Sequence, residues 1–115
     1  MDIFIWLRSW FTDRGKSLSM YRSGMAKANK ADFAGAIADY SAAIQSPKIP
    51  PDVRAMAIYN RALAYSAIDE DEKAAADLAS LLEMPGLPEI IQSAAQQRRA
   101  RIRRRFEDAD DQEID

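Results

Sequence analysis

Apolar residues recur every three to four positions along almost the whole chain, and strand-like alternation of apolar and polar residues is absent. This period places apolar side chains on one face of an α-helix. Proline stands between the periodic segments, where helices end. Helices joined by short turns must reverse direction. The pattern therefore predicts an all-α protein built from antiparallel helix pairs.

Local signals at the segment ends predict five or six helices. Pro51 and Pro88 suit the first turn of a helix, and the acidic run "DEDE" at 69–72 suits a positive helix N-terminus. Gly15, Pro47 and Pro85 suit positions just after the end of a helix. In chain order, the expected helices cover about residues 3–12, 17–29, 32–46, 51–68, 70–84 and 88–106.

One spacing of small, large and apolar residues occurs twice. In both copies the intervals are four, three and four, and the copies are 38 residues apart: Ala36, Tyr40, Ala43 and Pro47, then Ala74, Leu78, Leu81 and Pro85. A small residue, Gly24 or Ala62, stands twelve positions before each copy. Small side chains let two helices approach closely, while larger neighbours fill the space beside them. The duplication therefore predicts one helix-pair contact made twice.

These residues resemble the tetratricopeptide repeat, a helix–turn–helix unit of about 34 residues. Arg61 departs from the family pattern, because it stands where the pattern has a leucine. The resemblance covers about residues 17–86 and implies a short solenoid of stacked helix pairs. The expected parts are an amphipathic helix (1–16), two repeats (17–50 and 51–86), an arginine-rich capping helix (87–106) and an acidic disordered tail (107–115).

In this family the first helix of each pair lines a concave groove that binds another protein or a peptide. Carried over by spacing, that face presents Leu18, Tyr21, Met25, Asn29, Met56, Tyr59, Leu63 and Ser66. Some members of the family bind the C-terminal carboxylate of a peptide with Lys, Arg and Asn side chains on this face. Here the face has only Asn29 of such a set. The expected ligand is therefore an amphipathic helix or an apolar peptide. The alternative is that these residues are core, covered by the first or last helix of the chain.

The N-terminal segment concentrates four aromatic residues and a leucine on one helical face, namely Phe4, Trp6, Leu7, Trp10 and Phe11. An exposed apolar face of a few hundred Å² would gain several kcal/mol on being covered, at about 25 cal/mol per Å². The cover could be the groove, a partner protein or a membrane surface. Membrane-surface helices carry several basic residues on the polar face. This segment has few basic residues, so we expect its apolar face to be shielded by protein. The alternative is a membrane-peripheral adaptor that is anchored by this segment.

The C-terminal stretch separates its charges into a basic run and an acidic run. All six arginines of the first run could contact the phosphates of a nucleic acid: Arg98, Arg99, Arg101, Arg103, Arg104 and Arg105. The six acids of residues 107–115 could instead fold back on them, and Arg103–Glu107 and Arg104–Asp108 have helical pairing distance. We favour this self-compensated terminus over nucleic-acid binding. Because acids oppose the dipole at a helix C-terminus, the helix should end near Phe106.

Composition narrows the chemistry. The chain has no cysteine and no histidine, which excludes disulfides, thiolate metal sites and the commonest general base. No nucleophile–base pair, phosphate loop or metal-ligand cluster is apparent, so we expect no catalytic residues, metal or cofactor. The apolar start is a poor secretory signal, and no apolar run is long enough to span a bilayer, so we expect a cytoplasmic protein. The sequence thus predicts a non-catalytic scaffold whose partner is another protein or peptide. A homo-oligomer is also compatible with the sequence.

Overall fold

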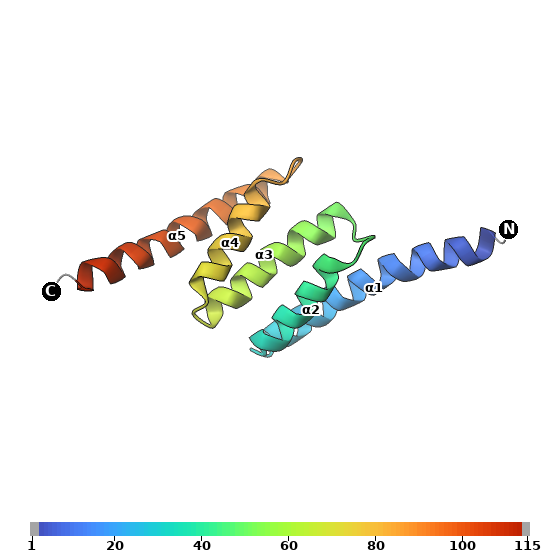
Figure 1. Ribbon diagram of the computed structural model, residues 1–115, viewed down its shortest axis with the longest axis horizontal. Helices are drawn as coiled ribbons and strands as arrows, with labels where there is room; N and C mark the ends of the chain where they lie inside the picture. The colour runs from blue at the N-terminus through green and yellow to red at the C-terminus, as the bar shows by residue number, and fades with distance from the viewer. Residues whose placement is uncertain (1–2, 114–115) are drawn as a thin grey trace.

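The computed structural model describes the backbone of residues 3–113 and the side chains of residues 15–111. Over this range every regular element is a helix, which confirms the predicted all-α class. Its five helices are α1 (Ile3–Asn29), α2 (Phe33–Gln45), α3 (Pro51–Ala67), α4 (Asp71–Leu82) and α5 (Glu89–Glu113). Each helix packs against the one before it, and α1 also contacts α3. Consecutive helices run in opposite directions (Figure 1).

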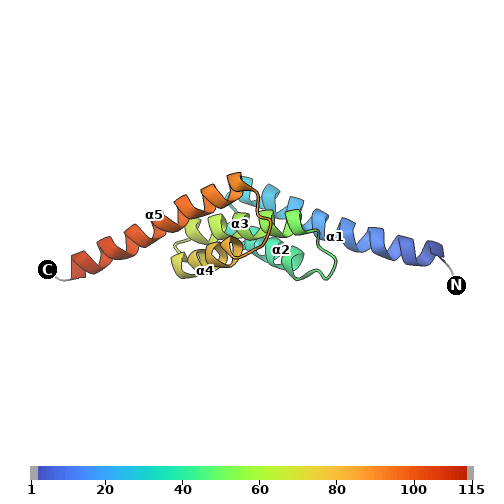
Figure 2. The same cartoon turned by 90° about the horizontal axis from the view of Figure 1, so that it is seen from above.

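The molecule is elongated, measuring 71 × 30 × 19 Å, with its two termini at opposite ends (Figure 1). Seen from above, α2 and α4 lie along one edge of the array, while α1 and α5 lie along the opposite edge (Figure 2). In Figure 2, α3 lies between these two edges.

Two predicted helix boundaries are wrong. The break near Gly15 is absent, because α1 continues through it to Asn29. An isolated glycine costs a helix only about 1 kcal/mol, and helix-forming sequence on both sides outweighs that cost. The expected end near Phe106 is also absent, because α5 continues to Glu113. Residues 107–113 are thus helical rather than disordered. Glu, Ala and Gln are good helix formers, and the unfavourable dipole term is only about 0.3–1 kcal/mol.

The sequence duplication is also a duplication of the backbone. Ala31 and Asp69, each two residues after the end of α1 or α3, both have positive φ angles, 63° and 61°. In each turn the next amide, that of Asp32 or Glu70, donates to a carbonyl five residues earlier over 2.9 Å. The preceding amide, that of Ala31 or Asp69, donates to a carbonyl three residues earlier. The two hydrogen bonds together form a Schellman motif, a common helix ending. The corresponding hydrogen bonds lie 38 positions apart, so both helix pairs turn in the same way.

The small residues lie where the helices of each pair approach. A Cβ atom added to Gly24 would lie 2.6 Å from Cε1 of Tyr40, so the α2 tyrosine ring packs directly against the α1 backbone. Ala36, Ala62 and Ala74 are all buried. In the second pair, Ala62 and Ala74 share a core cluster with Leu78. Both pairs therefore bury their small residues, beside a tyrosine ring in the first pair and within an apolar cluster in the second.

Arg61, which departs from the family pattern, joins three helices. Its guanidinium donates to both carboxylate oxygens of Asp77 on α4, over 2.8 and 2.7 Å, and to Ser41 Oγ on α2 over 3.1 Å. The Asp77 hydrogen bonds are the main cause of a raised Arg61 pKa, against the opposing effect of burial. The ion pair joins the two helices of the second pair, and the hydrogen bond to Ser41 links that pair to α2 of the first.

The Gly24→Ala substitution should lower the free energy of unfolding. Overpacking against the buried Tyr40 ring should cost about 3 kcal/mol, and the better helix propensity of alanine should return about 1 kcal/mol. Gly15→Ala is the matched control, because nothing lies within 4 Å of its added Cβ and it should stabilise the protein. Urea unfolding followed by circular dichroism measures both. Equal stabilities for the two variants would contradict this packing.

The Ala31→Gly substitution should raise the free energy of unfolding. An L-residue in the left-handed region costs about 1–2 kcal/mol, and glycine avoids this at a smaller entropic cost. Ala26→Gly, in the exposed helix interior of the same α1, should instead lose about 1 kcal/mol. Thermal unfolding distinguishes them, since the two midpoints should move in opposite directions.

The Asp77→Ala substitution should destabilise the protein by about 3 kcal/mol, because it leaves the partly buried Arg61 charge without its carboxylate partner. Asp39→Ala provides the comparison. Its ion pair with Lys27, at 3.0 Å, is more exposed, with side-chain exposures of 43% and 22% against 20% and 10% for Arg61–Asp77. Exposed pairs contribute about 1 kcal/mol or less. Similar losses for both variants in denaturant unfolding would show that Arg61 does not need its partner.

Candidate functional site

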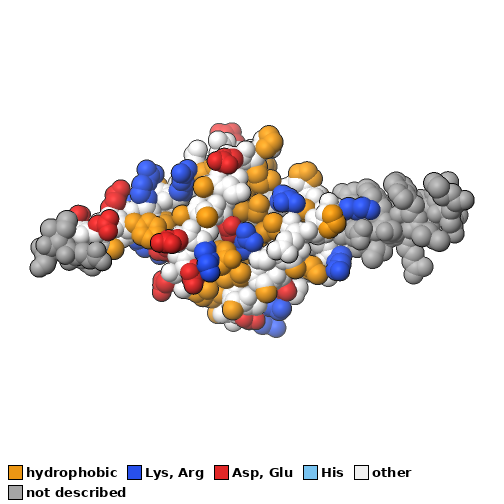
Figure 3. Space-filling view, in the orientation of Figure 1, with side chains coloured by type: hydrophobic (Ala, Val, Ile, Leu, Met, Phe, Trp, Pro, Cys, Tyr) orange, Lys and Arg blue, Asp and Glu red, His pale blue; other side chains and the backbone are white. Residues whose placement is uncertain are grey.

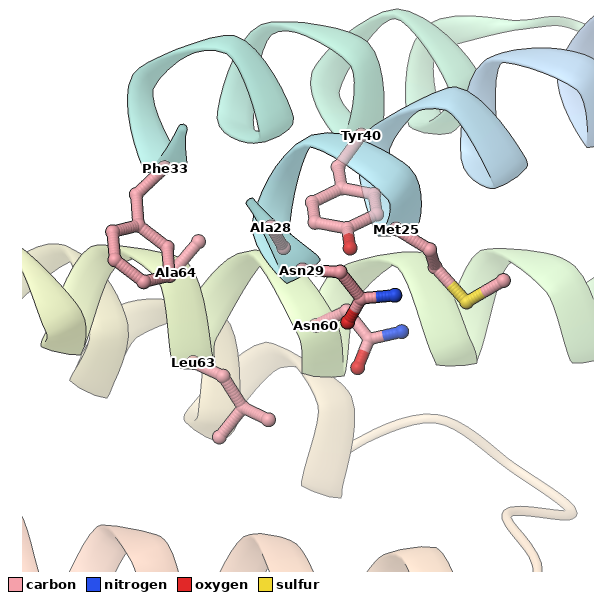
Figure 4. Close-up of a pocket in the computed structure, with 8 residues that line it drawn as sticks. All are labelled: Met25, Ala28, Asn29, Phe33, Tyr40, Asn60, Leu63 and Ala64. Atoms are coloured by element: carbon pink, nitrogen blue, oxygen red, sulfur yellow. The ribbon is translucent and has the colours of Figure 1, made fainter. Parts of the chain in front are cut away.

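A hollow of about 360 Å³ lies where α1, α2 and α3 meet. This volume is within the range of small-ligand and side-chain pockets. None of its eight lining residues is charged: Met25, Ala28, Asn29, Phe33, Tyr40, Asn60, Leu63 and Ala64 (Figure 4).

Helical spacing brings these residues together. The α1 residues Met25, Ala28 and Asn29 follow the i, i+3, i+4 pattern of one face, and Asn60, Leu63 and Ala64 repeat it on α3. From α2 come Phe33, at its first turn, and Tyr40. The contact between Gly24 and Tyr40 fixes the distance between α1 and α2. The packing contact of the first helix pair thus also shapes the hollow.

The centre of the hollow is polar and neutral. The Tyr40 hydroxyl points toward the amides of Asn29 and Asn60 (Figure 4). Asn60 Nδ2 also donates to Tyr21 Oη over 2.9 Å, and the Tyr21 and Tyr40 ring centroids are 6.0 Å apart. Burial raises the pKa of Tyr40, and nearby Tyr21 and Asp39 raise it further. Burial likewise raises the pKa of Tyr21, against the Asn60 hydrogen bond. Both phenols therefore stay protonated near neutral pH.

The rim of the hollow is apolar. Met25 is 36% exposed, and Leu63 and Phe33 are partly exposed. Their side chains surround the amides from three different helices (Figure 4). The site can therefore cover an apolar group while its amides and hydroxyl form hydrogen bonds.

The structure does not gather all eight predicted groove residues at this hollow. Met25, Asn29 and Leu63 line it, and Tyr21 reaches it through Asn60. The others lie elsewhere: Met56 lines a separate hollow of about 270 Å³, Ser66 accepts a hydrogen bond from Arg105, Tyr59 packs against the core cluster, and Leu18 is half-buried. That these residues bind a partner stays a prediction.

Sequence reasoning missed five of the lining residues: Ala28, Phe33, Tyr40, Asn60 and Ala64. Phe33 and Tyr40 belong to α2, the helix that the family pattern places outside the groove. Asn60 lies on the same face of α3 as Leu63. Its spacing of three before Leu63 could have marked it as a neighbour on the same face.

The N-terminal apolar side chains of Phe4, Trp6, Leu7, Trp10 and Phe11 lie outside the described residues. Their backbone belongs to α1. No helix, within the part of the chain described, is both long and apolar enough to cross a membrane. Shielding by protein and docking on a membrane surface both stay predictions.

The arginine run lies on α5. Arg98 is partly buried and the other five arginines are exposed. Arg105 Nη2 donates to Ser66 Oγ on α3 over 2.9 Å and lies 3.6 Å from Asp71 Oδ1. Among the described side chains, the expected pairs Arg103–Glu107 and Arg104–Asp108 do not approach within 4 Å. The acidic run continues the helix, so residues 107–113 do not fold back on the arginines as expected.

The described carboxylates do not gather in groups of three or more that could hold a metal ion, and this includes the "DEDE" turn. No protein-family model, curated protein or solved structure matches this chain. The geometry of the hollow and the duplicated helix pair are therefore the basis for a function.

Proposed function

We propose that this protein is a non-catalytic interaction module, a small tetratricopeptide-like helical scaffold. Its ligand is an apolar peptide or an amphipathic helix held in the hollow between α1, α2 and α3. The observation that carries the proposal is the uncharged lining of this hollow, with an apolar rim around two amides.

The duplicated backbone supports the tetratricopeptide-like reading. A tetratricopeptide unit packs two helices through small residues at fixed positions and stacks on the next unit. Here both pairs bury their small residues, and Gly24 admits the Tyr40 ring. The same turn hydrogen bonds recur at an offset of 38 residues.

The lining chemistry suits binding rather than catalysis. An apolar rim with Met25 adapts to the shape of a hydrophobic side chain, because methionine is unbranched and flexible. Asn29 and Asn60 can each donate and accept hydrogen bonds, which suits the backbone or a polar edge of a peptide. The remaining polar group at the centre, the Tyr40 phenol, has a raised pKa and is a weak proton donor near neutral pH.

Binding can be tested with peptides selected on the purified protein from a displayed library of apolar and amphipathic sequences. Met25→Glu and Leu63→Glu should each weaken a selected peptide by about tenfold or more, because each would place a carboxylate against its apolar surface. Fluorescence polarisation with the labelled peptide measures the affinities.

Ile90→Glu is the matched control, since Ile90 is 79% exposed and lies on α5, outside the hollow. It should change the affinity less than about twofold. Chemical shift changes on adding the peptide should centre on Asn60 and Leu63. Selected peptides that bind all variants equally, or that perturb only α5, would contradict this site.

A further inference from the structure

The C-terminal half of α5 separates its charges in a way that the body of the protein does not. On the face shown in Figure 3, acidic and basic side chains are interspersed over the body. In α5, residues 98–105 contain six arginines and no acid, and residues 107–111 contain four acids and no base. Phe106 stands between the two runs.

One stripe of α5 carries this separation along a single helical face. Arg99, Arg103, Phe106 and Asp110 are spaced four, three and four residues apart. This spacing is that of the contact positions of paired helices. The stripe is thus basic on one side of Phe106 and acidic on the other.

The stripe is open to contact. Residues 103–111 are all exposed, and Phe106 is 41% exposed despite its large apolar ring. Beside it, a shallow groove of about 240 Å³ runs between α4 and α5, lined by Ala75, Arg99, Ile102, Arg103 and Phe106. That lining contains two cations and no acid. A fitting occupant therefore brings acidic groups and covers an aromatic ring.

The charges of this stripe are not compensated by ion pairs within residues 15–111. Among the described residues, Arg99, Arg103 and Asp110 have no ion-pair partner within 4 Å. Arginine N-terminal to an acid is also the weaker order for pairs along one helix. The acids oppose the dipole at the C-terminal end of α5. A basic surface placed against them would stabilise this end of the helix.

We propose that two copies of this chain pair through α5 in an antiparallel arrangement centred on Phe106. The two Phe106 rings then meet at the two-fold axis. Arg103, three residues before the centre, faces Asp110 of the second copy, four residues after it. Because one surface contacts itself, both copies gain the same Arg103–Asp110 contact. The pairing is independent of the proposed peptide binding.

Such an interface is small, because the paired segment of α5 is about 20 Å long at 1.5 Å per residue. Its affinity should therefore be modest and should fall as salt screens the ion pairs. Sedimentation equilibrium of the full chain should show a dimer at low salt. The dissociation constant should rise about tenfold or more between about 50 and 500 mM NaCl.

Arg103→Glu and Asp110→Lys should each weaken the dimer by about tenfold or more, because each places two pairs of like charges opposite one another. Arg104→Glu and Asp111→Lys are the matched controls, since each makes the same charge change one residue away, off the stripe. These controls should remain within about threefold of the wild type. An equimolar mixture of the Arg103→Glu and Asp110→Lys chains should form a heterodimer, because every contact is again between opposite charges.

A wild-type chain that stays monomeric at about 100 µM in low salt would overturn the proposal. Equal losses in the stripe variants and their controls would also overturn it, as would failure of the mixture to associate. The proposal would also be overturned if the wild type bound a duplex oligonucleotide as a monomer and Arg103→Glu abolished this binding. The arginines would then serve a polyanion instead of a second copy.

Discussion

The close approach of α1 to α2 at Gly24 is the constraint on which the first half of the structure depends. With no side chain on Gly24, the Tyr40 ring rests against the α1 backbone and is almost fully buried. This contact sets the spacing of the pair and makes Tyr40 the inner wall of the hollow. The same ring brings a hydroxyl to Asn29 and Asn60. One packing contact therefore determines both stability and the chemistry of the candidate site.

The two helix pairs share a backbone but differ in what holds them together. The first relies on the glycine–tyrosine contact, whereas the second packs Ala62 and Ala74 with leucines in a continuous apolar cluster. Arg61 adds a charged link between α3 and α4 and reaches Ser41 of α2. Since Ser41 follows Tyr40 directly, the Arg61 hydrogen bond and the tyrosine contact act on neighbouring positions of α2. A disturbance in one pair is thus expected to reach the other through this helix.

Periodicity and spacing predicted most of the fold, because they report directly on which faces are buried. The bounds of α2, α3 and α4 follow the proline and acidic signals closely. The small residues were identified from the intervals alone. The helix ends predicted at Gly15 and before the acidic run were wrong, because the helix propensity of a few residues is a weak effect that the rest of a helix can outweigh. The left-handed turns at Ala31 and Asp69 carry no glycine, so the sequence gives no local sign of them.

The candidate site was predicted only in part. Met25, Asn29 and Leu63 could be found because they lie on the expected faces of α1 and α3. Phe33 and Tyr40 could not, since their position depends on how α2 is rotated against its neighbours. The role of Arg61 was also hidden, because a charged residue in an apolar pattern is uninformative until its carboxylate partner is located.

The elongated shape affects how the size of this protein is judged in solution. Its radius of gyration is 16.9 Å. A compact domain of this length would have about 13 Å. A rod-like particle experiences more friction than a sphere of equal mass, so a single chain should leave a sizing column early. Elution volume alone would then overestimate the number of subunits, and mass has to be measured by light scattering or at sedimentation equilibrium.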